Sequence, residues 1–298
     1  MEPDGIILID KPKGITSHDA VNRMRRLLRT KKIGHTGTLD PDATGLLVIL
    51  VGRAAKAAEY ITADEKEYEA TLRLGIATDT QDISGRIISE CENIPTPETV
   101  YNIISSFEGE YRQIPPMYSA LKQNGRKLVD LARRGIEIER EPRAVTIKEI
   151  TAEQISKTDY KMTVGCSKGT YIRTLCDDIG KKLGCGGCMA SLIRTKSGGF
   201  DISNAYTLDE CENMTYEQLC GKLIQTESLF TDLPVLKLSG FFLKLCKSGG
   251  EIYQKKINTS YVIGQRLRLY DEEGFYALGE VREFEDGSAV KSIKVFRL

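Results

Sequence analysis

Residues 46 to 51 read LLVILV, six apolar residues in succession with Gly45 before them and Gly52 after them. The run has the length of a strand, and its lack of alternation is typical of a strand buried on both faces. The N-terminal segment GIILID, at positions 5 to 10, has the same character. These two segments predict strands at the centre of a sheet that other parts of the protein cover.

Strands and helices follow one another without a fixed order along the rest of the chain. The spacing of apolar residues predicts strands over 68–74, 160–166 and 188–195, and helices over 53–61, 97–107, 126–134, 170–183 and from Ser17, taken as an N-terminal cap. Because no regular βαβ period is present, we expect an α+β protein rather than a doubly wound sheet. Short β-like pieces separated by glycines predict a small, mostly β accessory domain over residues 233–298.

Composition indicates an ordinary globular protein whose 298 residues can hold one large domain and a smaller appendage. No stretch approaches ~18 consecutive apolar residues, and MEPDGIILID is acidic where a signal peptide is basic, so we expect a cytoplasmic protein outside the membrane. The eight cysteines lack the spacing of a small disulfide-bonded domain, so we expect reduced thiols. Cys185 and Cys188 are the one close pair, and the two histidines exclude a histidine-rich metal site.

The formal net charge is zero, but the charges are unevenly distributed. Residues 11 to 56 hold ten basic and three acidic side chains, whereas residues 201 to 232 hold seven acidic side chains and one lysine. Residues 122 to 148 hold eight basic and four acidic side chains. Phosphate binding requires only a local basic patch, so a nucleic-acid partner is compatible with the neutral total. A solvated helix face is the ordinary alternative.

The loop HTGTLDPDATG, residues 35 to 45, leads directly into the buried run. Asp40-Pro41 near glycine is ordinary turn chemistry. Asp40 and Asp42 could form a carboxylate pair, although acids two residues apart in a loop seldom face each other across a substrate, and the phosphate-binding pattern GxxxxGK[ST] is absent. A nucleophilic Asp40 is a further alternative, which requires a cation to orient it. Arg173 is a candidate for that cation, but spacing alone does not place it near Asp40.

Five segments closely resemble, in this order, motifs of the bacterial tRNA pseudouridine-55 synthases of the TruB family: LIDKPKGITSHDAV, KKIGHTGTLDPDATGLLVILVGRAAK, KEYEATLRLGIATDTQDISG, PPMYSALKQNGRK and CSKGTYIRTLCDDIG. The resemblance implies a pseudouridine synthase fold over residues 1–232, with a central mixed, mainly antiparallel sheet flanked by helices and loops. Residues 122–148 resemble the RNA-gripping insertion of the family, although Val129 stands where an aromatic residue is usual. Residues 233–298 resemble its PUA-type RNA-binding domain.

Members of this family convert one uridine in the T loop of tRNA to pseudouridine, and they use no metal, nucleotide or redox cofactor. The nucleotide must first be extruded, at a cost on the order of a few kcal/mol. The resemblance implies that Asp40 is the nucleophile, attacking ribose C1′ or base C6, that Tyr68 stacks on the flipped base, and that Arg173 pairs with Asp40. It further implies substrate contacts for His35, Asp82, Tyr171 and Leu192, and contacts with the RNA backbone for Arg133 and Arg134.

The implied partner is the T arm of tRNA, bound by a monomer that needs no obligatory protein partner. A guide-RNA-dependent synthase of the dyskerin type shares the catalytic motifs but works with partner proteins. The short basic insertion and the compact tail favour the stand-alone form. A tRNA-binding chaperone without chemistry is an alternative from another class, and the presence of Asp40, Tyr68 and Arg173 favours an enzyme.

Overall fold

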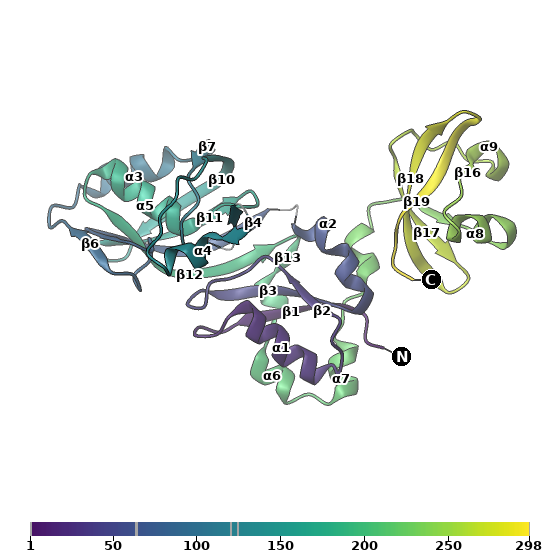
Figure 1. Cartoon of the computed structure of the whole chain (residues 1–298), viewed down its shortest axis with the longest axis horizontal. Helices are drawn as coiled ribbons and strands as arrows, with labels where there is room; N and C mark the ends of the chain where they lie inside the picture. Colours follow the sequence, from purple (N-terminus) through teal and green to yellow (C-terminus); the bar gives the residue numbers. More distant parts are fainter. Residues whose placement is uncertain (1, 63–64, 120, 124, 298) are drawn as a thin grey trace.

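The computed structural model describes residues 2–62, 65–119, 121–123 and 125–297, and within them the largest sheet has ten strands (Figure 1). Eight of these form the path β14 (Tyr206–Thr207), β1 (Gly5–Lys11), β3 (Thr44–Val51), β12 (Gly187–Ser197), β4 (Lys66–Leu74), β11 (Asp159–Cys166), β10 (Arg143–Gln154) and β7 (Gly109–Gln113). β2 (Ile33–Thr36) pairs with β3, and β13 (Phe200–Asp201) with β12. Among the described strands of this sheet, β1 pairs with β14 and β3 with β12 in parallel, and the other pairs are antiparallel. The expected α+β class and mixed, mainly antiparallel sheet are confirmed.

The LLVILV segment lies in β3, between β1 and β12, and every residue of it is at most 1% exposed. Alternate residues pack against Val21 and Met24 of α1 (Ser17–Leu27), on the face also covered by α6 (Leu208–Glu212) and α7 (Tyr216–Gly221). The others pack with Ala54 and Ile61, from η1 (Gly52–Ala57) and α2 (Ala58–Thr62). Burial on both faces agrees with the sequence pattern.

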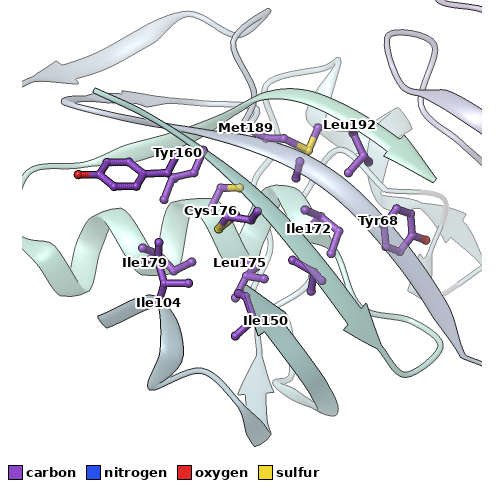
Figure 2. Close-up of a cluster of buried hydrophobic side chains, with 14 of the residues drawn as sticks. Tyr68, Ile104, Ile150, Tyr160, Ile172, Leu175, Cys176, Ile179, Met189 and Leu192 are labelled. Carbon is purple, nitrogen blue, oxygen red and sulfur yellow. The ribbon is translucent and has the colours of Figure 1, made fainter. Parts of the chain in front are cut away.

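Helices α3 (Pro97–Ser105) and α5 (Ile172–Leu183) cover the other half of the sheet. Figure 2 shows Leu175 and Ile179 of α5 among the side chains that the strands contribute to this core. The same figure places Ile172, Tyr68 and Leu192 at one end of the cluster, where the first turn of α5 meets β4 and β12. This end of the core forms part of the wall of the cavity described below.

Two local expectations are wrong. The N-terminal cap of α1 is Thr16, not Ser17: the Thr16 hydroxyl accepts from the Asp19 N–H, and the Asp19 carboxylate accepts from the Thr16 N–H at 2.9 Å. This reciprocal pair satisfies two free donors of the helix start. The helix expected over 126–134 is shorter, α4 (Leu128–Ala132), because β9 (Arg126–Lys127) precedes it and a turn at Gly135, with a φ of +72°, follows it.

In the part of the chain that the structure describes, two small hairpins lie outside the large sheet. They are formed by β5 (Ile76–Thr78) with β6 (Ile87–Glu90), and by β8 (Lys122–Gln123) with β9. The second belongs to the segment expected to be an RNA-gripping insertion, of which residue 124 lies outside the described residues. All eight cysteines are free thiols, as expected.

The C-terminal part is built on a second sheet with the strand order β15 (Val235–Lys237), β17 (Arg266–Asp271), β18 (Gly274–Phe284), β19 (Gly287–Val295) and β16 (Ile252–Tyr253). Helices α8 (Gly240–Lys247) and α9 (Gln254–Ile257) accompany it (Figure 1). It has a separate hydrophobic core. Ala57, Phe230, Leu278 and Phe296 pack together where the two parts meet. No helix in the described ranges has both the length and the apolar character needed to cross a membrane.

Candidate active site

Asp40 lies in the loop between β2 and β3, and a buried lysine fixes this loop. The Lys11 ammonium, 0% exposed, donates to the carbonyls of Pro12 and Ile15 at 2.9 Å each and to that of Pro41 at 3.2 Å. The Ser17 hydroxyl is within hydrogen-bond distance of both the N–H and the carbonyl of Leu39. The residues on either side of Asp40 are thus attached to the last residue of β1 and the first residue of α1.

Arg194 of β12 holds the two ends of the same loop. Its guanidinium, 1% exposed, donates to the Leu46 carbonyl at 2.8 Å and to the Gly37 carbonyl at 3.0 Å. Gly45 has a φ of +100°, and a Cβ there would lie 2.4 Å from the Arg194 carbonyl oxygen, so only glycine allows this approach. Lys11 and Arg194 are both absent from the sequence-based set of site residues.

Arg173, in the first turn of α5, forms an ion pair with Asp40. Its Nε lies 3.0 Å from Asp40 Oδ2, and its Nη2 donates to Asp40 Oδ1 at 3.4 Å, so the two planar groups meet side-on. The guanidinium also donates to the carbonyls of Tyr118 at 2.8 Å and Thr80 at 3.3 Å, and its Nη1 lies 3.6 Å from Asp82 Oδ2. The Arg173 side chain is 6% exposed, whereas that of Asp40 is 43% exposed. The arginine is therefore fixed by protein, and the carboxylate remains accessible.

Two opposing effects act on the Asp40 carboxyl. Burial raises its pKa, and the nearby guanidinium of Arg173 lowers it; the net direction is upward. Burial also raises the pKa of the Tyr68 hydroxyl, against the opposing effect of Arg194. Tyr68 is 7% exposed, and its hydroxyl lies close to the Arg194 guanidinium.

A cavity of about 610 Å³ opens beside this ion pair, and Asp40, Tyr68, Tyr171, Arg173 and Leu192 all line it. A second cavity of about 530 Å³ shares Asp40, Arg173 and Leu192 and adds Asp82. Pockets of ~300–1,000 Å³ are typical for organic ligands. An accessible carboxylate, a fixed guanidinium and an aromatic wall thus surround a space that can hold a nucleobase.

The structure does not bring every expected residue to this cavity. His35 lies in β2 and lines neither cavity; its Nδ1 is buried without a hydrogen-bond partner, and burial lowers its pKa. Arg133 lines both cavities, whereas Arg134 lines neither. Val129, the departure from the family pattern, also lines both. Among the described residues, no group of three or more His, Cys, Asp and Glu side chains is arranged to hold a metal ion.

The basic patch expected over residues 11 to 56 is smaller than its composition suggests. Lys11 is buried, and Arg53 and Lys32 each pair with an acidic side chain near the N-terminus at 3.0 Å. Arg23 of α1 lies 3.7 Å from Glu212 of α6, and Arg29 stacks on the Tyr216 ring. The acidic stretch after β14 therefore packs beside the basic helix and offsets part of its charge.

Two solved structures share the fold of the chain over nearly its whole length. An H/ACA RNP bound to a substrate RNA containing 2′-deoxyuridine matches with a TM-score of 0.70 and 23% identity, covering 100% of this chain and 86% of the other. A Cbf5-Nop10-Gar1 complex matches with a TM-score of 0.69 and 25% identity, covering 99% and 85%. The likeness shows that this chain has the fold of these proteins.

The family description "TruB family pseudouridylate synthase (N terminal domain)" matches residues 25–172, and "tRNA pseudouridylate synthase B C-terminal domain" matches residues 173–229. A protein of Alkaliphilus oremlandii named tRNA pseudouridine synthase B is 43% identical, over 99% of this chain and 98% of its own length. Proteins of the same name from Francisella philomiragia and Clostridium tetani are 41% and 42% identical, over 96% and 93% of this chain and 93% and 95% of their own lengths. The chain belongs to the TruB family of pseudouridylate synthases.

Proposed function

We propose that this chain isomerises uridine 55 in the T loop of tRNA to pseudouridine. The observation that carries the proposal is the side-on ion pair between Asp40 and Arg173 at the wall of a cavity large enough for a nucleobase. Relatives that are 41–43% identical over almost the full length and are named tRNA pseudouridine synthase B support tRNA as the substrate class.

The proposed reaction rearranges one nucleotide and needs no redox partner. The bond from C1′ to N1 breaks and a bond from C1′ to C5 forms, while C5 loses a proton and N1 gains one. Substrate and product therefore contain the same atoms. Asp40 acts as the nucleophile on ribose C1′ or on base C6, and because its carboxyl is 43% exposed it can meet an extruded nucleotide.

The remaining cavity residues take roles that their positions support. Arg173 orients Asp40 through two contacts and lowers its pKa against the larger effect of burial. Tyr68 stacks on the flipped base, and Tyr171 and Leu192 complete the pocket wall. Asp82 lies where it can hydrogen-bond the extruded loop. His35 would fill the space left by the flipped bases from β2, outside the cavity walls.

The chain is proposed to bind RNA through three regions. Residues 1–232 form the catalytic domain, residues 122–148 its RNA-gripping insertion, and residues 233–298 a PUA-like domain. Arg133 and Arg134 are the proposed backbone contacts of the insertion. Such contacts make binding salt-sensitive, while the shape of the folded T arm supplies selectivity.

We further propose that the enzyme works in the cytoplasm as a monomer, without a cofactor or an obligatory protein partner. The guide-RNA-dependent alternative shares the fold, since an H/ACA RNP bound to a substrate RNA matches this chain with a TM-score of 0.70 at 23% identity. The stand-alone form is favoured because relatives named tRNA pseudouridine synthase B are far more similar to it.

The test is an assay on an unmodified T-arm stem-loop, with purified protein and no added cofactor or protein. Tritium release from C5, together with mass labelling of the product nucleoside, should report pseudouridine at position 55. A product at another position would contradict the proposed site, and product only after addition of guide RNA and partner proteins would favour the alternative.

A further inference from the structure

Gln81 lies in the turn between β5 and β6 and has a φ of +65°, a conformation that residues with side chains rarely adopt. Its two neighbours contact Arg173. The Thr80 carbonyl accepts from Arg173 Nη1 at 3.3 Å, and Asp82 Oδ2 lies 3.6 Å from the same nitrogen. The turn thus presents two oxygen atoms to the guanidinium that holds Asp40.

The side chain of Gln81 binds α5, the helix that carries Arg173. Its Nε2 donates to Asp177 Oδ2 at 2.7 Å, and its Oε1 accepts from the Thr174 hydroxyl at 2.8 Å. Thr174 and Asp177 are 2% and 4% exposed, so both bonds lie in a buried environment where polar groups must be satisfied. The amide of one glutamine therefore ties the turn to the helix through both of its polar atoms.

The backbone of the turn is also bound to β12. The Met189 N–H donates to the Gln81 carbonyl at 3.0 Å, and the Ile83 N–H donates to the Met189 carbonyl at 2.9 Å. Within the turn, Asp82 Oδ1 accepts from the Ser84 N–H at 3.0 Å and from the Thr80 hydroxyl at 2.9 Å. The turn is therefore held on β12 by its backbone and on α5 by the Gln81 amide.

We propose that Gln81 is a positioning residue for the reaction: its amide fixes the turn on α5 so that Thr80 and Asp82 hold Arg173 in line with Asp40. This inference rests on the function proposed above. Without the amide, the side-chain attachment of the turn to α5 is lost, and Thr80 and Asp82 hold Arg173 less firmly. Arg173 then keeps its bond to the Tyr118 carbonyl, but the two contacts from the turn that align it with Asp40 are weakened.

A change in the pKa of Asp40 distinguishes a positioning role of Gln81 from a role in stability alone. The charged groups that act on Asp40 are Arg173 of α5, Asp82 of the turn, Lys11 of β1 and Asp42 of its own loop. Arg173 lowers the pKa of Asp40 and has a larger effect on it than Asp82, which raises it, so weaker pairing with Arg173 gives a net rise in that pKa. Fewer molecules then carry an ionised nucleophile at acidic pH, so the acidic limb of the rate profile moves to higher pH.

The experiment compares Gln81→Gly with the wild type in single-turnover reactions on a T-arm stem-loop. Glycine accepts the positive φ without strain, so any loss reflects the missing amide. The rate should fall by about tenfold or more, the RNA dissociation constant should stay within about threefold, and the acidic limb should move to higher pH. Gln218→Gly is the matched control, because it removes an exposed amide that accepts from the Thr215 N–H at 2.9 Å in α7 and should leave the rate unchanged.

The outcomes are distinguishable. No product from the wild type overturns the proposed function, whereas equal rates in wild type and Gln81→Gly overturn only the role of Gln81. A rate loss with an unmoved acidic limb, or one fully explained by weaker RNA binding, also overturns it. If Gln81→Gly does not fold, Thr174→Val tests the role of Gln81 instead, because it keeps the side-chain shape and removes one hydrogen bond to Gln81. This variant should lower the rate, and an unchanged rate would overturn the role.

Discussion

Replacing Arg173 by lysine keeps the positive charge beside Asp40 but removes the planar group that meets it at two points. The guanidinium makes contacts of 3.0 and 3.4 Å with Asp40 and bonds of 2.8 and 3.3 Å with two backbone carbonyls. A lysine ammonium is a point charge on a flexible stem and cannot reproduce this set. Bonds to charged groups contribute about 1.5–3 kcal/mol each, so losing one or two raises the barrier by ~3 kcal/mol, roughly 10²-fold in rate.

Comparison with Arg173→Met separates the effect of the positive charge from the effect of its orientation. Methionine removes the charge as well, and loss of one partner of a buried ion pair costs ~3–5 kcal/mol. Because 43% of the Asp40 side chain is exposed, solvent screening keeps the cost of losing the guanidinium near ~3 kcal/mol, the lower end of this range. Most of the loss should therefore already occur in Arg173→Lys, measured as single-turnover pseudouridine formation on a T-arm stem-loop. A lysine variant within about threefold of the wild type, beside an inactive methionine variant, would show that charge rather than orientation is required.

Two further predictions concern stability and RNA binding. Burial raises the pKa of Asp178 from the ordinary value of 3.8 to about 6, so folding is favoured when the group is protonated and stability is lost as the pH rises from about 4 to 6. Asp178→Asn should stabilise the protein by ~1–2 kcal/mol at pH 8, after allowance for solvent screening, and not at pH 3; urea unfolding that shows an equal gain at both pH values would refute this. Arg133→Ala combined with Arg134→Ala should weaken tRNA binding and flatten its salt dependence, with the larger share from Arg133 because it lines the cavity. An unchanged salt dependence of tRNA binding would show that the insertion does not contact the RNA backbone.

The parts of the fold that the sequence could predict are those with a local signal. LLVILV indicated a strand buried on both faces because all six of its residues are apolar. The alternation of apolar and polar residues from Tyr68 to Leu74 matches β4. The cap of α1 was misplaced by one residue because Thr16 and Ser17 are both good caps. Only the hydrogen bonds of the folded chain show that Thr16 closes the helix while Ser17 binds the loop of Asp40.

The site was harder to predict because its interacting groups are either side chains that are distant in sequence or carbonyl oxygens of the backbone. Asp40 and Arg173 are 133 positions apart, and only the family resemblance suggested that they meet. Lys11 and Arg194 were missed because their acceptors are carbonyl oxygens, which every residue has. For Lys11, the available signal was its position at the end of a buried strand, since a buried ammonium must find hydrogen-bond acceptors.

Asp40→Asn tests the central claim most directly, because it removes the negative charge of the proposed nucleophile with little change of shape. The measurement is pseudouridine formation at position 55 of unmodified tRNA transcript under single-turnover conditions, with tRNA affinity determined in parallel. The variant should form no pseudouridine while its affinity stays within about tenfold of the wild type, ~1.4 kcal/mol. Pseudouridine formation at the wild-type rate would contradict the account.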